Sequence, residues 1–182
     1  MRITIYNAND SEEDLVLERR VAELSEILGD RHDIEAVKLN NLDLKFCNGC
    51  WACWVKTPGR CVVKDDMAKI HQSFISSDLV IFAAPMRMGF PGSLMKKVTD
   101  RLIPLVHPYI ELVNDECHHV PRYDNYPSWG LILEEEEQGT QADLDLVREI
   151  YERTALNIKS SLLFSYSSSS TAIEIADEID HI

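Results

Sequence analysis

Four cysteines in one short segment are the residues of this chain most able to do chemistry. Cys47, Cys50 and Cys53 stand at three-residue intervals, and Cys61 follows them within the same segment. Thiolates held this close can ligate an iron-sulfur cluster or a tetrahedral zinc ion. The close succession of Cys-x-x-Cys steps favours iron-sulfur, because zinc sites usually pair cysteines from two separated knuckles.

Two metal-free interpretations of the same cysteines remain open. They could be reduced thiols packed beside Trp51 and Trp54, or Cys50 and Cys53 could work as a thiol redox pair. Residues 1–30 contain no uninterrupted apolar run, so neither a signal peptide nor a membrane span is expected and the chain is expected to be cytoplasmic. In a reducing compartment, clustered cysteines are more often metal ligands or redox groups than disulfides.

The overall charge bears on the partners. A net charge of -13 would repel phosphate backbones, and no stretch gathers Lys and Arg on one face with interleaved aromatics. We therefore expect no nucleic-acid partner, and small molecules or proteins instead.

Apolar periodicity alternates between strand and helix along the whole chain. Five strands joined by helices predict an α/β fold with a parallel sheet, helices on both faces and strand order 2-1-3-4-5, in one domain over residues 1–182. The predicted strands are Arg2–Tyr6, Ile34–Leu39, Leu79–Ala84, Trp129–Leu133 and Leu162–Tyr166. The predicted helices lie around Leu17–Leu28, Asp65–Phe74, Leu94–Leu105, Val147–Ile158 and Ala172–Ile179, with a long polar loop before the fourth strand.

Ligands of such sheets bind beyond the carboxyl ends of the strands, where the strand order reverses. Three loops are expected there: Asn7–Ser11, Pro85–Ser93 and Glu134–Thr140. The cysteine segment follows the second strand, so we expect it to lie at the same edge as these loops.

Several motifs together resemble the flavodoxin-like NAD(P)H-dependent FMN reductases, and the cysteine spacing is similar to that of their iron-sulfur flavoprotein branch. The resemblance rests on the cysteine motif of residues 47–53, on Cys61 to Met67, on Ser77 to Pro85, and on residues 93–101. It implies a flavodoxin-like three-layer sandwich that binds FMN and takes hydride from NADH or NADPH. Flavin or quinone reduction, or electron transfer to a small-molecule or protein acceptor, would follow.

The resemblance also implies site residues. By resemblance, Cys47, Cys50, Cys53 and Cys61 would ligate a 4Fe-4S cluster, and the protein would be a homodimer or homotetramer. The segment Pro85, Met86, Arg87, Met88 and Gly89 would lie along the isoalloxazine edge, where its amides can bond flavin N5 or the pyrimidine oxygens. Asn7, Asn9 and Ser11 would donate to the FMN phosphate. No side chain needs to act as an acid or base, so no catalytic residue is assigned.

The first strand-end loop departs from the family pattern. The family usually has Gly-Ser-x-Arg there, whereas this loop holds four carboxylates, Asp10, Glu12, Glu13 and Asp14, and no base. At about 5 Å and an effective dielectric near 20, each carboxylate would oppose each phosphate charge by roughly 3 kcal/mol before screening.

Two outcomes remain open for this loop. In one, the carboxylates form a solvated first helical turn and the amides from Ala8 to Ser11 stay free for the phosphate. In the other, the chain is a non-catalytic flavodoxin-like scaffold, or a metal- or partner-binding module, that has lost the flavin site.

Overall fold

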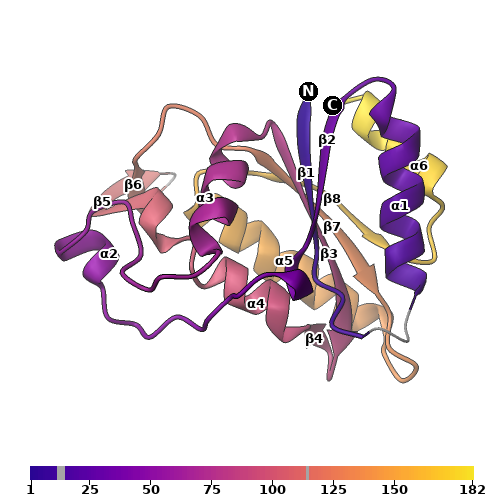
Figure 1. Ribbon diagram of the computed structural model, residues 1–182, viewed down its shortest axis with the longest axis horizontal. Coiled ribbons are helices and arrows are strands. Elements are labelled where there is room, and N and C mark those ends of the chain that lie inside the picture. The colour runs from indigo at the N-terminus through magenta and orange to yellow at the C-terminus, as the bar shows by residue number, and fades with distance from the viewer. Residues whose placement is uncertain (12–14, 114) are drawn as a thin grey trace.

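A parallel sheet forms the centre of the molecule (Figure 1). The structure is a computed structural model that describes residues 1–11, 15–113 and 115–182. Its five parallel strands lie in the order β2-β1-β3-β7-β8, which confirms the predicted order 2-1-3-4-5. Their bounds are β1 Arg2–Asn7, β2 Asp33–Lys38, β3 Leu79–Arg87, β7 Ser128–Glu134 and β8 Leu162–Ser167.

Alternating side chains of these strands feed two apolar cores, one on each face of the sheet. In β1, Ile3 and Ile5 point to one core, whereas Tyr6 belongs to the other. All of β3 from Leu79 to Met86 is buried, as expected for a strand covered on both faces. The apolar runs in the sequence are therefore the direct cause of the central strands.

Helices cover both faces of the sheet (Figure 1). The core on one face is completed by α1 and α6, and the core on the other face by α3, α4 and α5. Thr140 and Thr171 start α5 and α6 with capping boxes, in which the threonine and an acidic side chain satisfy each other's backbone amides. The helix bounds are α1 Val16–Gly29, α2 Ala52–Val55, α3 Met67–Ser76, α4 Ser93–Thr99, α5 Gln141–Asn157 and α6 Ala172–Asp180.

Three details differ from the sequence-based prediction. A short strand, β4 (Phe90–Pro91), pairs antiparallel with the end of β3. The long loop predicted before β7 instead contains an antiparallel ribbon of β5 (Val106–Val113) and β6 (Glu116–Pro121). The helix predicted to reach Leu105 ends at Thr99, and a 3-10 turn, η2 (Ile103–Leu105), follows it; a second such turn, η1 (Leu39–Asn41), follows β2.

Candidate functional site

The loop after β1 is held by its own asparagines. Asn7 and Asn9 are 2% and 4% exposed. The Asn7 side-chain oxygen accepts the Asn9 N–H at 3.0 Å, and the Asn9 oxygen accepts the Ser11 N–H at 3.0 Å, so two Asx turns follow each other. The Ala8 N–H donates to the Ala83 carbonyl. The expectation of free amides is thus wrong for Ala8, Asn9 and Ser11, and a phosphate here would meet side chains rather than these amides.

Two basic side chains from neighbouring strands lie near this loop, and one of them pairs with a loop carboxylate. Lys38, which pairs in register with Asn7, forms an ion pair with Glu18 at 2.5 Å. Arg87 at the end of β3 lies 3.5 Å from the Asp10 carboxylate. The other three carboxylates of the loop, Glu12, Glu13 and Asp14, lie outside the described residues.

A cavity of about 260 Å³ opens beside the same loop, at the ends of β1 and β2. Its walls include Asn9 and Ser11 from the first loop and Lys38, Asn40 and Asn41 from the end of β2 and the turn η1. The Glu18 carboxylate lines the same cavity and pairs with Lys38, so the hollow combines amide and hydroxyl groups with an ion pair rather than with an uncompensated base.

The turn between β3 and β4 presents two backbone donors side by side. Met88 and Gly89 adopt left-handed conformations, with φ of 55° and 76°. Their N–H groups both donate to the Glu136 carboxylate, at 2.9 and 2.6 Å. Successive amides that converge in this way form an anion-binding nest, and here a carboxylate from the loop after β7 occupies it. The turn contains only Met88 and Gly89, because β3 continues through Pro85, Met86 and Arg87.

The four cysteines surround a second, smaller hollow. Cys47, Cys50, Cys53 and Cys61 all line one cavity of about 40 Å³. Burial raises the pKa of the Cys53 thiol, and the neighbouring Cys61 raises it further. Among the residues that the structure describes, no three His, Cys, Asp or Glu side chains are arranged to hold one metal ion. The four thiols are therefore not positioned as the ligands of a single zinc ion, whose thiolate sulfurs lie only about 3.8 Å apart, and the loop would have to rearrange to hold any metal centre.

A clamp closes the two ends of the cysteine loop, defined here as residues 45–65. The Lys45 N–H donates to the Asp65 carboxylate at 3.0 Å, and Arg101 bonds both the Asp65 carboxylate and the Lys45 carbonyl. The Arg101 and Asp65 side chains are only 2% and 1% exposed. Burial raises the pKa of Asp65, but hydrogen bonds from Arg101 and from the amides of Lys45 and Met67 outweigh it, so the pKa lies below its usual value.

The cysteine loop does not lie beside the strand-end loops within one chain, so that expectation is wrong. The Trp54 indole N–H donates to the carbonyls of Ile103 and Val106, at 3.0 Å each, which anchors α2 to the segment after α4. Figure 1 shows α2 at one end of the molecule near β5, well away from β4 and the end of β1. The clamp directs the chain outward past α3. The cysteine loop therefore lies away from the carboxyl edge of the sheet, although it follows β2 in the sequence.

The order of the strands and the helices on both faces of the sheet define a flavodoxin-like α/β protein. The model of the NADPH-dependent FMN reductase family matches residues 2–115, more than half of the chain. The chain belongs to this family. The match covers the loops after β1 and β3 and the whole cysteine loop.

Two curated relatives carry the description iron-sulfur flavoprotein. The chain is 28% identical to the protein from Archaeoglobus fulgidus over 102 residues, which cover 56% of this chain and 48% of the relative. It is 30% identical to the protein from Methanosarcina thermophila over 82 residues, 45% of this chain and 42% of the relative. The chain thus spans less than half the length of either relative.

A solved structure shows the same fold. The NAD(P)H:quinone oxidoreductase from Methanothermobacter marburgensis superposes with a TM-score of 0.64 at 14% identity, covering 97% of this chain and 90% of that one.

Three functional candidates in the structure were absent from the sequence-based set. Lys38 could have been found, because the neighbouring strands β1 and β2 end at the same edge of a parallel sheet. Arg101 lay inside a motif of the family resemblance but had no role assigned to it. Glu136 gave no signal, since it is one of four successive glutamates and only the folded loop shows which of them reaches the β3–β4 turn.

Proposed function

We propose that this chain is an NAD(P)H-dependent FMN oxidoreductase, with FMN bound by the loops after β1, β3 and β7. Membership of the family supports the cofactor. The observation that carries the site is the pair of converging amides of Met88 and Gly89, which already holds an acceptor of the kind a flavin ring presents.

The residues of the strand-end loops have the chemical types needed to bind FMN, both at its phosphate and at its ring edge. Asn9 and Ser11 supply polar side chains for the phosphate, as part of the Asn7, Asn9 and Ser11 set expected from the sequence. Lys38 beside them would add positive charge for the phosphate on leaving its ion pair with Glu18. Met88 and Gly89 supply amides for the ring edge, and Arg87 adds positive charge next to them. When bound, FMN accepts a hydride from the nicotinamide and passes electrons to an acceptor, so the protein contributes position and electrostatics.

Glu136 restricts access to this ring-edge site. Its carboxylate holds the same two amides that the flavin would need, so the loop after β7 must withdraw before the ring can occupy them. The proposal therefore includes a rearrangement of this loop on flavin binding, as a substantial minority of proteins show when they bind a partner.

Anaerobic reduction tests the proposed activity. The FMN-loaded protein is mixed with NADPH or NADH, and loss of the visible flavin absorption band is followed with time. We expect bleaching that saturates with nicotinamide concentration and is far faster than that of free FMN. Reduction no faster than for free FMN, with either nicotinamide, would favour a non-catalytic scaffold.

We also propose that Cys47, Cys50, Cys53 and Cys61 hold a 4Fe-4S cluster. Four thiols around one cavity, in a segment from Lys45 to Lys64 that contains no Asp or Glu, form a soft ligand set without competing carboxylates. When bound, such a cluster carries single electrons. The resemblance to two iron-sulfur flavoproteins supports this assignment.

Anaerobic reconstitution with iron and sulfide tests the cluster. We expect the intact chain to retain iron and sulfide after desalting, Cys50→Ser to lose most of both, and Cys117→Ser, the matched control outside the loop, to retain them. Equal retention by the intact chain and Cys50→Ser would show that the bound iron is adventitious.

We further propose that the protein is a cytoplasmic homodimer or homotetramer. All five cysteines are free, as expected in a reducing compartment, and no helix of the described chain is long and apolar enough to cross a membrane. The cysteine loop and the ribbon β5–β6 expose large apolar side chains, which often mark contacts between subunits. These exposed side chains are Phe46, Trp51, Val55, Tyr109, Ile110 and Leu112.

A further inference from the structure

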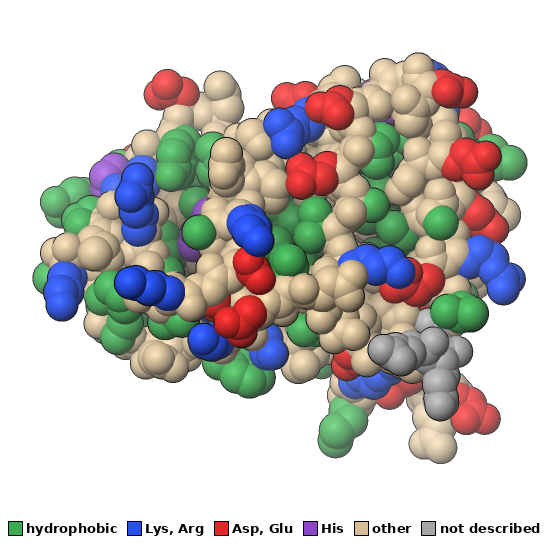
Figure 2. Space-filling view, viewed as in Figure 1, with side chains coloured by type: hydrophobic (Ala, Val, Ile, Leu, Met, Phe, Trp, Pro, Cys, Tyr) green, Lys and Arg blue, Asp and Glu red, His purple; other side chains and the backbone are tan. Residues whose placement is uncertain are grey.

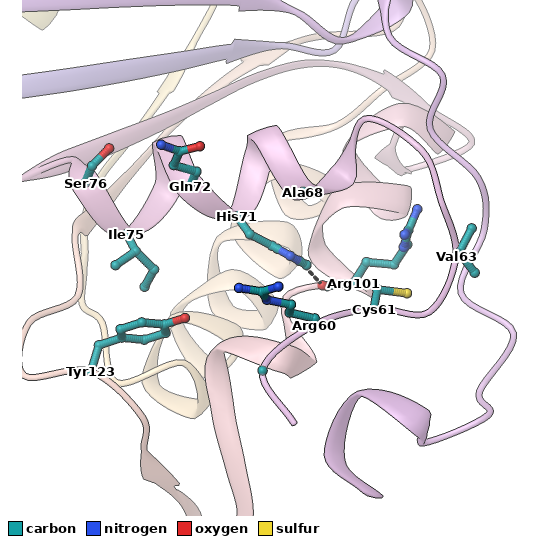
Figure 3. A pocket seen from close by; sticks show the side chains of 11 residues that line it. Arg60, Cys61, Val63, Ala68, His71, Gln72, Ile75, Ser76, Arg101 and Tyr123 are labelled. Atoms are coloured by element: carbon teal, nitrogen blue, oxygen red, sulfur yellow. Dashed lines mark hydrogen bonds between the residues drawn. The ribbon is translucent and has the colours of Figure 1, made fainter. Parts of the chain in front are cut away.

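A cavity of about 550 Å³ lies between α3 and the cysteine loop (Figure 3). It is larger than either hollow described above, and none of its walls comes from the strand-end loops. Its volume is within the range of roughly 300–1,000 Å³ typical of small-molecule sites. Nothing in the proposed flavin chemistry uses it.

The cavity opens in the most basic part of an acidic protein. Lys45, Lys56, Arg60 and Lys64 lie in a segment of the chain without a single carboxylate, although the whole chain carries a net charge of -13. Figure 2 shows Lys and Arg side chains gathered over α2 and the cysteine loop. This local excess of positive charge favours an anionic ligand.

Arg60 is the charged group that faces the cavity without a partner. Its side chain makes no ion pair or hydrogen bond with any residue of the described chain, and Figure 3 shows its guanidinium directed into the cavity. Arg101 also lines the cavity, but Asp65 already balances its charge. An unpaired guanidinium can bind a carboxylate through two parallel hydrogen bonds.

The other walls suit a flat apolar body. Ile75 and Val63 provide apolar surface, and the ring of Tyr123 closes the side opposite Val63 (Figure 3). Tyr123 is held by an edge contact with Tyr126, whose ring centre lies 6.1 Å away. An aromatic ring between Ile75 and Tyr123 would gain both apolar burial and ring-ring contact.

The wall that carries Tyr123 is fixed against the cysteine loop. Gly59 adopts a φ of 83°, and a Cβ there would lie 3.5 Å from Arg122, the residue before Tyr123. Arg122 in turn donates to the Pro104 carbonyl at 2.9 Å. Gly59 therefore leaves room for one more carbon atom at ordinary contact distance from Arg122, and the two walls lie side by side here.

His71 adds a neutral acceptor to the set. Its Nε2–H donates to the Arg101 carbonyl at 2.7 Å, because a carbonyl can only accept, so Nδ1 keeps its lone pair. Burial lowers the pKa of His71, despite the hydrogen bond to Arg101, so the ring is neutral at pH 7. The positive charge that selects the ligand is therefore that of Arg60.

We propose that this cavity binds a planar organic anion, in its simplest form an aromatic carboxylate, with the carboxylate on Arg60 and the ring between Ile75 and Tyr123. Cys61 and Val63 line both this cavity and the cysteine hollow, so the two cavities share a wall. The proposal does not depend on FMN binding.

Calorimetric titration of the full chain tests this site with two probes that share one ring system. 2-Naphthoate carries the anion, and 2-naphthalenemethanol is its neutral analogue. We expect saturable binding of naphthoate, weakened about tenfold or more in Arg60→Gln, with the alcohol bound equally by both chains. Lys64→Gln is the matched control, because it removes a neighbouring charge outside the cavity, and should leave naphthoate affinity within about twofold.

A second readout locates the ligand. Naphthoate should slow the alkylation of Cys61 in the metal-free chain but not that of Cys117, and Ile75→Trp, which fills the cavity, should abolish both binding and protection. No saturable naphthoate binding at millimolar ligand, equal affinity in Arg60→Gln, or an equal loss in Lys64→Gln would each overturn the proposal.

Discussion

At the scale of single residues, the strand-end site depends on which groups accept hydrogen bonds from its backbone amides. The amides of Met88 and Gly89 are aligned by left-handed backbone, and the Glu136 carboxylate takes both. An acidic side chain in this position both shows that the nest prefers an acceptor and competes with the flavin for it.

Replacing Glu136 should therefore strengthen flavin binding. Glu136→Ala frees two donors and removes one negative charge, so we expect FMN affinity to rise about tenfold, equivalent to ~1.4 kcal/mol, by quenching of flavin fluorescence. Glu137→Ala removes the same charge from an exposed neighbour and should change affinity less than about twofold. Weaker FMN binding in Glu136→Ala would mean that Glu136 contacts the flavin instead of competing with it.

At the scale of elements, the cysteine loop depends on one buried ion pair. Asp65 stands two residues before α3 and Arg101 two residues after α4, so their contact ties two helices to both ends of the loop. Removing one partner of a buried pair leaves the other charge uncompensated, which is far more costly than losing an exposed pair.

Unfolding in urea measures this difference. Asp65→Asn should lower the free energy of unfolding by about 3–5 kcal/mol, whereas Asp100→Asn, which breaks the exposed pair with Lys96, should cost less than about 1 kcal/mol. Equal losses in the two variants would show that the clamp contributes no more than a surface contact.

The pH dependence of this pair has a definite sign. Because the pKa of Asp65 is lowered on folding, its stabilisation is complete above the unfolded value of about 4 and is lost as pH falls through the lower folded pKa. The stability gap between the native chain and Asp65→Asn should therefore be constant near neutral pH and shrink below about pH 4. A gap that stays constant to the lowest pH would contradict the assigned shift.

The sequence predicted those helices and strands whose positions follow from the spacing of apolar residues alone. The buried runs of β3 and β7 and the helical stripe of α1 identified the sheet, its order and its layers. The ribbon β5–β6 was missed, because most of its residues face solvent and show no clear apolar alternation; in β6 only His118 is buried. The position of the cysteine loop was missed too, since it depends on Arg101 and Trp54, contacts made far along the chain.

At the scale of the whole molecule, three cavities have different proposed roles. The strand-end loops carry the proposed FMN site, the cysteine hollow lies at the far end of the same chain, and the α3 cavity adjoins it through Cys61. Figure 1 shows the cysteine loop and the strand-end loops apart from each other within one chain, so electron exchange between the proposed FMN and the proposed cluster would take place between subunits of the proposed oligomer.

The family, the order of the strands and the cysteine set were all accessible from the sequence. The donors that make the flavin site were accessible only in part: Asn7, Asn9 and Ser11 were named for the phosphate, but the capture of the ring-edge amides by Glu136 was not. A loop's hydrogen bonds are decided by folded geometry, which residue types and spacing do not contain.

Fluorescence titration of the flavin-free chain with FMN and with riboflavin is the most direct measurement of the strand-end site. A site that binds the phosphate through Asn9, Ser11 and Lys38 should saturate at one FMN per chain. It should bind riboflavin, which lacks the phosphate, at least about tenfold more weakly. Absence of saturable FMN binding, in both the native chain and Glu136→Ala, would contradict the assignment of the strand-end loops as a flavin site.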